Sequence, residues 1–115
     1  MADFSEKQIQ EVWDKARTIE GLDKSMYRMD YAGAIIKRDL YGKGTEQLDF
    51  GWEIDHVKPL SKNGSNDIDN LVPLHWKNNR HKDNNYPKFE TIVSSELGKD
   101  NYWRNIEKEQ YWEYK

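Results

Sequence analysis

The stretch between Phe50 and Lys82 limits the possible folds most, because strand, loop and helix patterns follow one another within it. Large apolar residues alternate with small or polar ones from Phe50 to Asp55, and a period of two predicts a strand. Pro59 cannot donate to a sheet ladder, so this strand should end or bend there. Residues 61–67 carry the Asn, Gly, Ser and Asp residues that are typical of a loop.

The second half of this stretch predicts a return strand and a helix. Leu71–Leu74 is a short apolar run, which we interpret as a brief strand. From His75 to about Lys82 the residues allow a short helix, and the segment 84–87, with two Asn residues and a Pro, should close it.

Helices are expected on both sides. The segment 5–21 predicts an amphipathic helix that opens with a Ser-Glu-Lys-Gln capping box and stops at a glycine. Residues Asp23 to Tyr41 suggest a second helical region. Near the C-terminus, the apolar residues from Phe89 to Leu97 suggest another helix, and Asp100 could cap a last one.

Length and composition suit one domain over residues 1–115. The absence of cysteine excludes disulfides and zinc sites built from thiolates. A net charge of −3 argues against a protein that wraps nucleic acid non-specifically, but a bound cation could still supply positive charge to an enzyme site. No apolar run is long enough to span a membrane, and the start lacks the features of a secretory signal. We therefore expect a cytoplasmic protein without a membrane partner.

Residues suited to phosphodiester hydrolysis gather in the central stretch. All three histidines and most asparagines lie between His56 and His81. Asp and Asn oxygens are ligands for hard cations such as Mg²⁺ or Mn²⁺. A neutral histidine is the side chain best suited to take a proton from water near pH 7.

The spacing of these residues closely resembles that of the HNH nuclease superfamily. Asp55-His56 is followed after thirteen residues by Asn70-Leu71, and Asn79-Arg80 begins nine residues after Asn70. The resemblance covers roughly residues 51–87. It implies an α+β fold with a ββα-metal core over residues 49–87, formed by a short two-stranded hairpin and a helix. We expect helical parts at 1–48 and 88–115 to flank this core.

The resemblance also implies roles for individual residues. Asp55 matches the first metal ligand, and Asn79 matches the ligand that the helix supplies. His56 matches the general base. Asn70 matches the Asn that braces the loop between the strands and so positions the base. Arg80 stands where many members carry a basic residue able to contact phosphate; stacking on Trp76, four residues earlier, is an alternative.

Helical geometry suggests one further ligand and raises one difficulty. Asp83 would share a face with Asn79 if the helix runs that far, whereas His81 would not. We therefore favour Asp83 as the extra ligand and set His75 and His81 aside. The difficulty is that Asp55 and His56 should point to opposite faces of a regular strand. A bend near Pro59 would resolve it.

The function that this resemblance implies is metal-dependent hydrolysis of DNA by an endonuclease with one divalent metal ion per site, leaving 5′ phosphate ends. Mg²⁺ or Mn²⁺ is expected, and Zn²⁺ or Ni²⁺ is an alternative. The catalytic residues would be His56, Asn70 and Arg80. Two other functions fit the same sequence: a bacterial nuclease toxin domain paired with an immunity protein, and a catalytically silent module that binds nucleic acid or protein. A bacterial or phage-type origin fits all three, and secretion as a toxin domain stays open.

Overall fold

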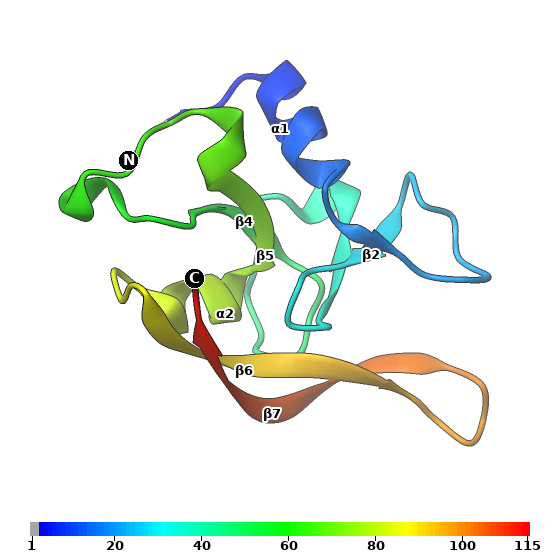
Figure 1. Ribbon diagram of the computed structural model, residues 1–115. Coiled ribbons are helices and arrows are strands. Elements are labelled where there is room, and N and C mark those ends of the chain that lie inside the picture. The colour runs from blue at the N-terminus through cyan, green and yellow to red at the C-terminus, as the bar shows by residue number, and fades with distance from the viewer. Residues whose placement is uncertain (1–2) are drawn as a thin grey trace.

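The computed structural model describes residues 3–115, which form two α-helices and three small antiparallel sheets (Figure 1). This confirms the predicted α+β class. The sheets have the strand orders β1-β2-β3, β4-β5 and β6-β7. In chain order the elements are α1 (Glu6–Trp13), β1 (Arg17–Thr18), β2 (Tyr27–Met29), β3 (Ile35–Lys37), β4 (Trp52–His56), β5 (Leu71–His75), α2 (Trp76–Lys82), β6 (Lys88–Leu97) and β7 (Trp103–Glu113).

Helix α1 begins at the predicted capping box. The Ser5 hydroxyl accepts from the Gln8 backbone N–H at 3.1 Å, and the Gln8 side chain accepts from the Ser5 N–H at 2.9 Å. The helix ends at Trp13, earlier than predicted. Its apolar face nevertheless packs into the main core, where the ring centres of Trp13 and Trp52 lie 5.3 Å apart. Neither helix in the described part of the chain is long and apolar enough to cross a membrane.

The helix predicted for residues 23–41 is wrong, because this segment forms the hairpin β2–β3. Asp30 opens the connecting turn: its backbone carbonyl accepts from Gly33, and its own N–H donates to Ala34. Gly33 has a φ of +92°, a conformation that glycine adopts without steric cost and that no helix contains. Ile35 and Ile36, which also fit a helical spacing, instead fill a buried strand.

The predicted helices of residues 88–115 are also wrong, because β6 and β7 form one long hairpin below α2 and the β4–β5 pair in Figure 1. Three consecutive β-branched residues, Thr91, Ile92 and Val93, favour the extended strand. Asp100 lies in the hairpin loop, where it accepts from the Tyr102 N–H and pairs with Arg104. It therefore orders a turn and caps no helix.

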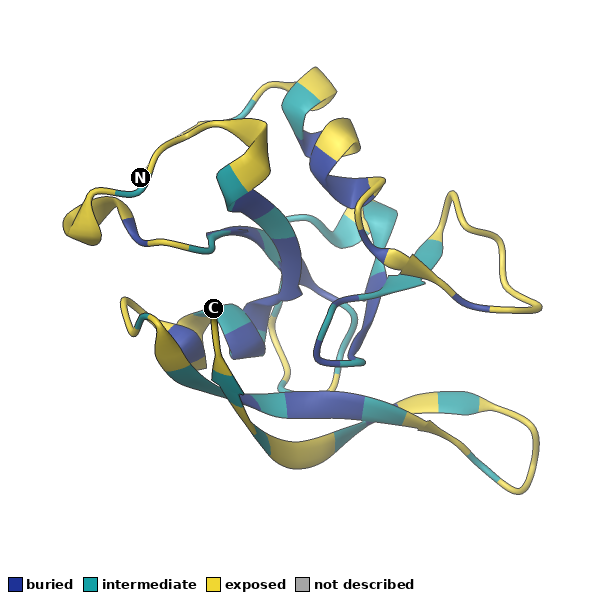
Figure 2. Cartoon of the chain, viewed as in Figure 1, coloured by how far each residue is buried: buried dark blue, intermediate teal, exposed yellow. Residues whose placement is uncertain are grey.

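The central strand-loop-strand-helix prediction is confirmed. Strand β4 pairs with β5 in antiparallel register from Trp52↔His75 to His56↔Leu71, and α2 begins at the next residue. Pro73 lies opposite Ile54. Because this sheet has only two strands within residues 3–115, no further strand on the other side of β5 needs the N–H that proline lacks. Figure 2 shows β4 and β5 as largely buried strands, whereas much of the loop between them is exposed.

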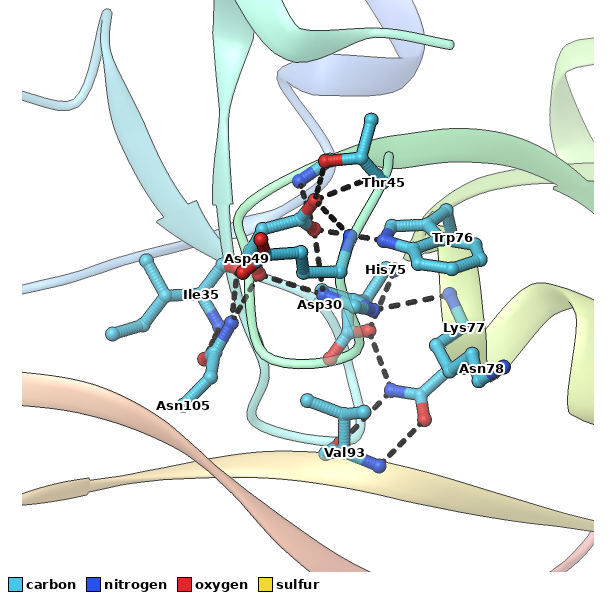
Figure 3. Close-up of polar contacts among 12 residues, drawn as sticks. Asp30, Ile35, Thr45, Asp49, His75, Trp76, Lys77, Asn78, Val93 and Asn105 are labelled. Carbon is cyan, nitrogen blue, oxygen red and sulfur yellow. Dashed lines mark hydrogen bonds and ion pairs between the residues drawn. The ribbon is translucent and has the colours of Figure 1, made fainter. Parts of the chain in front are cut away.

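A buried carboxylate joins the β2–β3 turn to the central unit (Figure 3). One oxygen of Asp30 accepts from the backbone N–H groups of Ala32 and Ala34, at 3.0 and 2.8 Å. The other accepts from the His75 N–H and the Asn78 amide, at 2.9 and 3.1 Å. Burial raises the pKa of Asp30 to about 6, and the four hydrogen bonds act in the opposite direction. The carboxylate thus fixes the start of α2 relative to the turn.

Two buried asparagines attach the long hairpin to the same unit. The Asn78 amide oxygen accepts from the N–H groups of Ile92 and Val93, and its nitrogen also donates to the Val93 carbonyl. Asn105 exchanges two hydrogen bonds with the Ile35 backbone. The segments that flank the central unit are thus held to it largely by buried polar side chains.

The network predicts a large loss of stability for Asn78→Ala. The substitution leaves the backbone N–H groups of Ile92 and Val93 without their acceptor, and each buried unsatisfied group costs about 1–3 kcal/mol. We expect the free energy of unfolding, measured in urea, to fall by about 3 kcal/mol or more. Asn79→Ala is the matched control: this half-buried neighbour makes one described hydrogen bond, so its loss should cost about 1 kcal/mol. Equal losses would contradict the bracing role of Asn78.

Candidate functional site

Asp55 lies on the face of β4 that packs against α2 and is almost entirely buried. One carboxylate oxygen, Oδ1, lies 3.3 Å from the Lys82 Nζ. The other, Oδ2, is buried and has no hydrogen-bond partner. Burial raises the pKa of Asp55 to about 6, although the Lys82 ammonium and His56 act in the opposite direction. Asp55 therefore offers an oxygen that a ligand could satisfy.

Lys82 is a residue that sequence reasoning missed. Its side chain is completely buried, which is rare for lysine unless the ammonium is paired. Besides Asp55, the ammonium donates to the backbone carbonyls of His56 and Val57, at 3.2 and 3.3 Å. It also lies 5.2 Å from the centre of the Phe89 ring. Nothing in the sequence distinguishes Lys82 from an exposed lysine, because its burial depends on β4 and β6.

Asp55 and Lys82 line a cavity of about 230 Å³ between the central unit and the long hairpin. Its other walls are mostly apolar or aromatic, and one further carboxylate borders it; these residues are Tyr31, Val57, Val72, Phe89, Trp112, Glu113 and Tyr114. Such low-polarity surroundings weaken solvation of the Asp55 carboxylate and strengthen its attraction to any cation.

His56 points away from this cavity, toward the loop on the other side of β4. Its Nε2 lies 2.7 Å from the Asn66 side-chain oxygen, and its ring centre is 6.0 Å from that of Phe4. The β4–β5 register runs without irregularity to His56, so the strand does not bend before this residue. The bend that we considered near Pro59 therefore does not bring Asp55 and His56 to one face.

Asn70 closes the loop that follows His56. Its side chain accepts from the Lys58 N–H at 2.9 Å and donates to the carbonyls of Lys58 and Ser65, at 3.0 and 2.8 Å. Its backbone carbonyl accepts from Val57. These four bonds hold both ends of the loop, which is the local geometry that a bracing asparagine requires.

Asn79 and Arg80 both contact Glu53. The Asn79 amide nitrogen donates to one Glu53 oxygen at 3.0 Å, and the Arg80 guanidinium lies 3.2 Å from the other. Arg80 also stacks over Trp76, with 5.1 Å between the guanidinium carbon and the ring centre, as the alternative interpretation suggested. Sequence reasoning missed Glu53, although its position two residues before Asp55 places both on one strand face.

The structure removes the reason for choosing Asp83. Helix α2 ends at Lys82, and Asp83 follows it with a φ of +51°. The shared helical face with Asn79 therefore does not extend to Asp83, whose side chain is exposed. The two histidines that we set aside also lie apart: His75 is buried at the start of α2 with its Nε2 on the Asp49 carbonyl, and His81 lies beside Glu90 on the surface.

The predicted site residues thus fall into three neighbouring groups along the central unit. Asp55 pairs with Lys82, Asn79 pairs with Glu53, and His56 contacts Asn66 across the strand. Within residues 3–115, no three His, Asp or Glu side chains are arranged to hold a metal ion. The donor chemistry nevertheless fits a hard cation, since Asp55 has a buried oxygen without a partner and Asn79 has an amide oxygen available.

Comparison with known proteins finds one family that matches the central unit. Residues 44–85 match the family described as HNH endonuclease, and this range contains β4, β5, α2 and every candidate site residue. No curated protein and no solved structure matches the chain. The resemblance seen in the sequence is therefore confirmed for residues 44–85, which we refer to below as the HNH segment.

Proposed function

We propose that this protein is an endonuclease that hydrolyses phosphodiester bonds in DNA with the help of a divalent metal ion. The observation that carries the proposal is the end of strand β4 within the HNH segment. There a histidine, hydrogen-bonded through one ring nitrogen, follows directly after a buried carboxylate with an unpaired oxygen. This combination offers a proton acceptor and a cation ligand at consecutive positions of the chain, on opposite faces of β4.

His56 is the proposed general base. Its ring is half-buried, and its described hydrogen bond to Asn66 uses Nε2, which leaves Nδ1 to accept a proton from water. Asn70 supports this position by closing the loop that carries Asn66. The exposed Arg80 guanidinium, held by Glu53 and Trp76, is proposed to contact a phosphate of the substrate.

Asp55 and Asn79 are the proposed metal ligands. Both offer oxygen donors, as Mg²⁺ and Mn²⁺ prefer, and they come from the facing elements β4 and α2. When bound, the cation would supply positive charge to the phosphate and to the leaving oxygen. Lys82 holds one Asp55 oxygen and the other has no hydrogen-bond partner, which supports Asp55 as a ligand.

A silent binding module is the second candidate, and one observation favours it. Asp55, His56 and Asn79 do not form a single cluster, and each has a protein partner instead. A module that keeps the HNH segment only as a scaffold would tolerate this arrangement. Cleavage assays separate the two candidates.

Cleavage should depend on His56 and on metal. Removal of a general base typically slows a reaction by about 10²- to 10⁴-fold, so we expect His56→Ala to lose at least about 99% of the cleavage rate on plasmid DNA with Mg²⁺ or Mn²⁺. EDTA should stop the wild-type reaction. His81→Ala, which changes an exposed histidine of the same segment, should cut at the wild-type rate. Absence of metal-dependent cutting by the wild type would favour the silent module.

Metal affinity should depend on Asp55 but not on Asp83. Asp55→Asn keeps the volume of the side chain and removes the charge that attracts a cation. Since even outer-shell changes typically cost 10- to 100-fold in metal affinity, we expect titration calorimetry with Mn²⁺ to show at least about tenfold weaker binding. The matched variant Asp83→Asn should bind Mn²⁺ like the wild type. The opposite ranking would restore Asp83 as the ligand.

The Asp55–Lys82 pair should also stabilise the fold. Lys82→Met leaves a buried carboxylate and two carbonyls without their partner, and such a loss typically costs about 3–5 kcal/mol. The double variant Asp55→Asn with Lys82→Met removes both charges and should recover part of this loss in urea unfolding. If Lys82→Met unfolds at the wild-type urea concentration, the pair does not contribute as the geometry indicates.

A further inference from the structure

The side chain of Asn66 defines which nitrogen of His56 carries the proton. An amide oxygen can only accept a hydrogen bond, and Asn66 Oδ1 lies 2.7 Å from His56 Nε2. Nε2 must therefore donate, so a neutral His56 has its proton on Nε2 and a lone pair on Nδ1. Neither the sequence motif nor the resemblance gave Asn66 any role.

The position of Asn66 is itself fixed through Asn70. The Asn70 amide donates to the carbonyl of Ser65, the residue before Asn66, at 2.8 Å. On the other side, the Asp67 N–H donates to the Ser65 hydroxyl at 3.2 Å. The side chain that reaches His56 thus stands between two anchored neighbours.

The imidazole also lies beside an aromatic ring. The Phe4 ring lies 6.0 Å from the His56 ring at an angle of 42°. Phe4 therefore packs beside the His56 ring, and Asn66 is the hydrogen-bond partner of its Nε2. Both partners are uncharged side chains, and both reach the ring from outside strand β4.

We propose that Asn66 is a positioning residue that keeps His56 in the Nε2–H tautomer and turns Nδ1 toward the attacking water. In the step that this serves, a water O–H bond breaks, the proton passes to Nδ1, and the water oxygen bonds to phosphorus. The bond from phosphorus to the 3′ oxygen then breaks, and the leaving 3′ oxygen takes a proton from solvent water to become a hydroxyl. His56 is left as an imidazolium that later returns its proton to solvent. The use of the tautomer in hydrolysis rests on the proposed function, whereas the tautomer itself does not.

The tautomer can be measured directly by ¹⁵N NMR of His56 in the full-length protein without metal, at a pH where the ring is neutral. The wild type should show Nε2–H only. Asn66→Ala should show a mixture of both tautomers, because the selecting acceptor is gone. Asn66→Asp keeps an acceptor oxygen at the same distance along the side chain and should retain Nε2–H. Ser61→Ala, an exposed change in the same loop, should match the wild type.

Cleavage kinetics then test the positioning role. For Asn66→Ala we expect kcat to fall at least about tenfold with KM unchanged, because a misdirected base affects the chemical step and not substrate binding. An Nδ1–H signal in the wild type, or an unchanged tautomer in Asn66→Ala, would overturn the assignment. An unchanged kcat with a changed tautomer would overturn the role in hydrolysis. If the wild type cuts nothing, the proposed function fails together with this role, while NMR still decides the tautomer.

Discussion

The carboxylate of Asp30 accepts four hydrogen bonds inside the protein, and the position of helix α2 depends on them. Two come from its own turn, and two come from residues at and after the end of β5. Asn78 continues this connection to the long hairpin β6–β7. A buried polar group is costly unless its partners are all present, so this network favours one arrangement of the three sheets over any other.

With α2 fixed, one face of the helix meets β4 at two points. Asn79 and Arg80 meet Glu53, and Lys82 reaches Asp55 together with the carbonyls that end the strand. The result is a buried carboxylate with one oxygen held by an ammonium and one left free. His56 lies across the strand, where the loop closed by Asn70 presents Asn66 to its ring. In the proposed function, α2 and β4 would provide the cation ligands, and the loop would orient the base.

The sequence predicts the central unit well because its signals are local. The period of two before Pro59, the turn-rich loop and the short apolar run each act within a few residues. Residues 23–41 and 88–115 are different, because a few apolar side chains there fit a helix as well as a strand. Contacts far along the chain decide between them: Asn105 binds the Ile35 backbone, and a glycine with positive φ turns the first hairpin. The same limit applies to the site, where Asp55, His56, Asn70 and Asn79 follow a spacing pattern, but Lys82 and Asn66 gain their roles only from the folded chain.

The measurement that tests the central claim most directly is cleavage of DNA in ¹⁸O-labelled water, with Mg²⁺ or Mn²⁺ present, followed by mass analysis of the new ends. Activation of water by His56 predicts that one labelled oxygen enters each newly formed 5′ phosphate and that the His56→Ala protein forms this product at least about 100-fold more slowly. Ends that carry a 3′ phosphate, an unlabelled 5′ phosphate, or equal labelling by the His56→Ala protein would contradict the account.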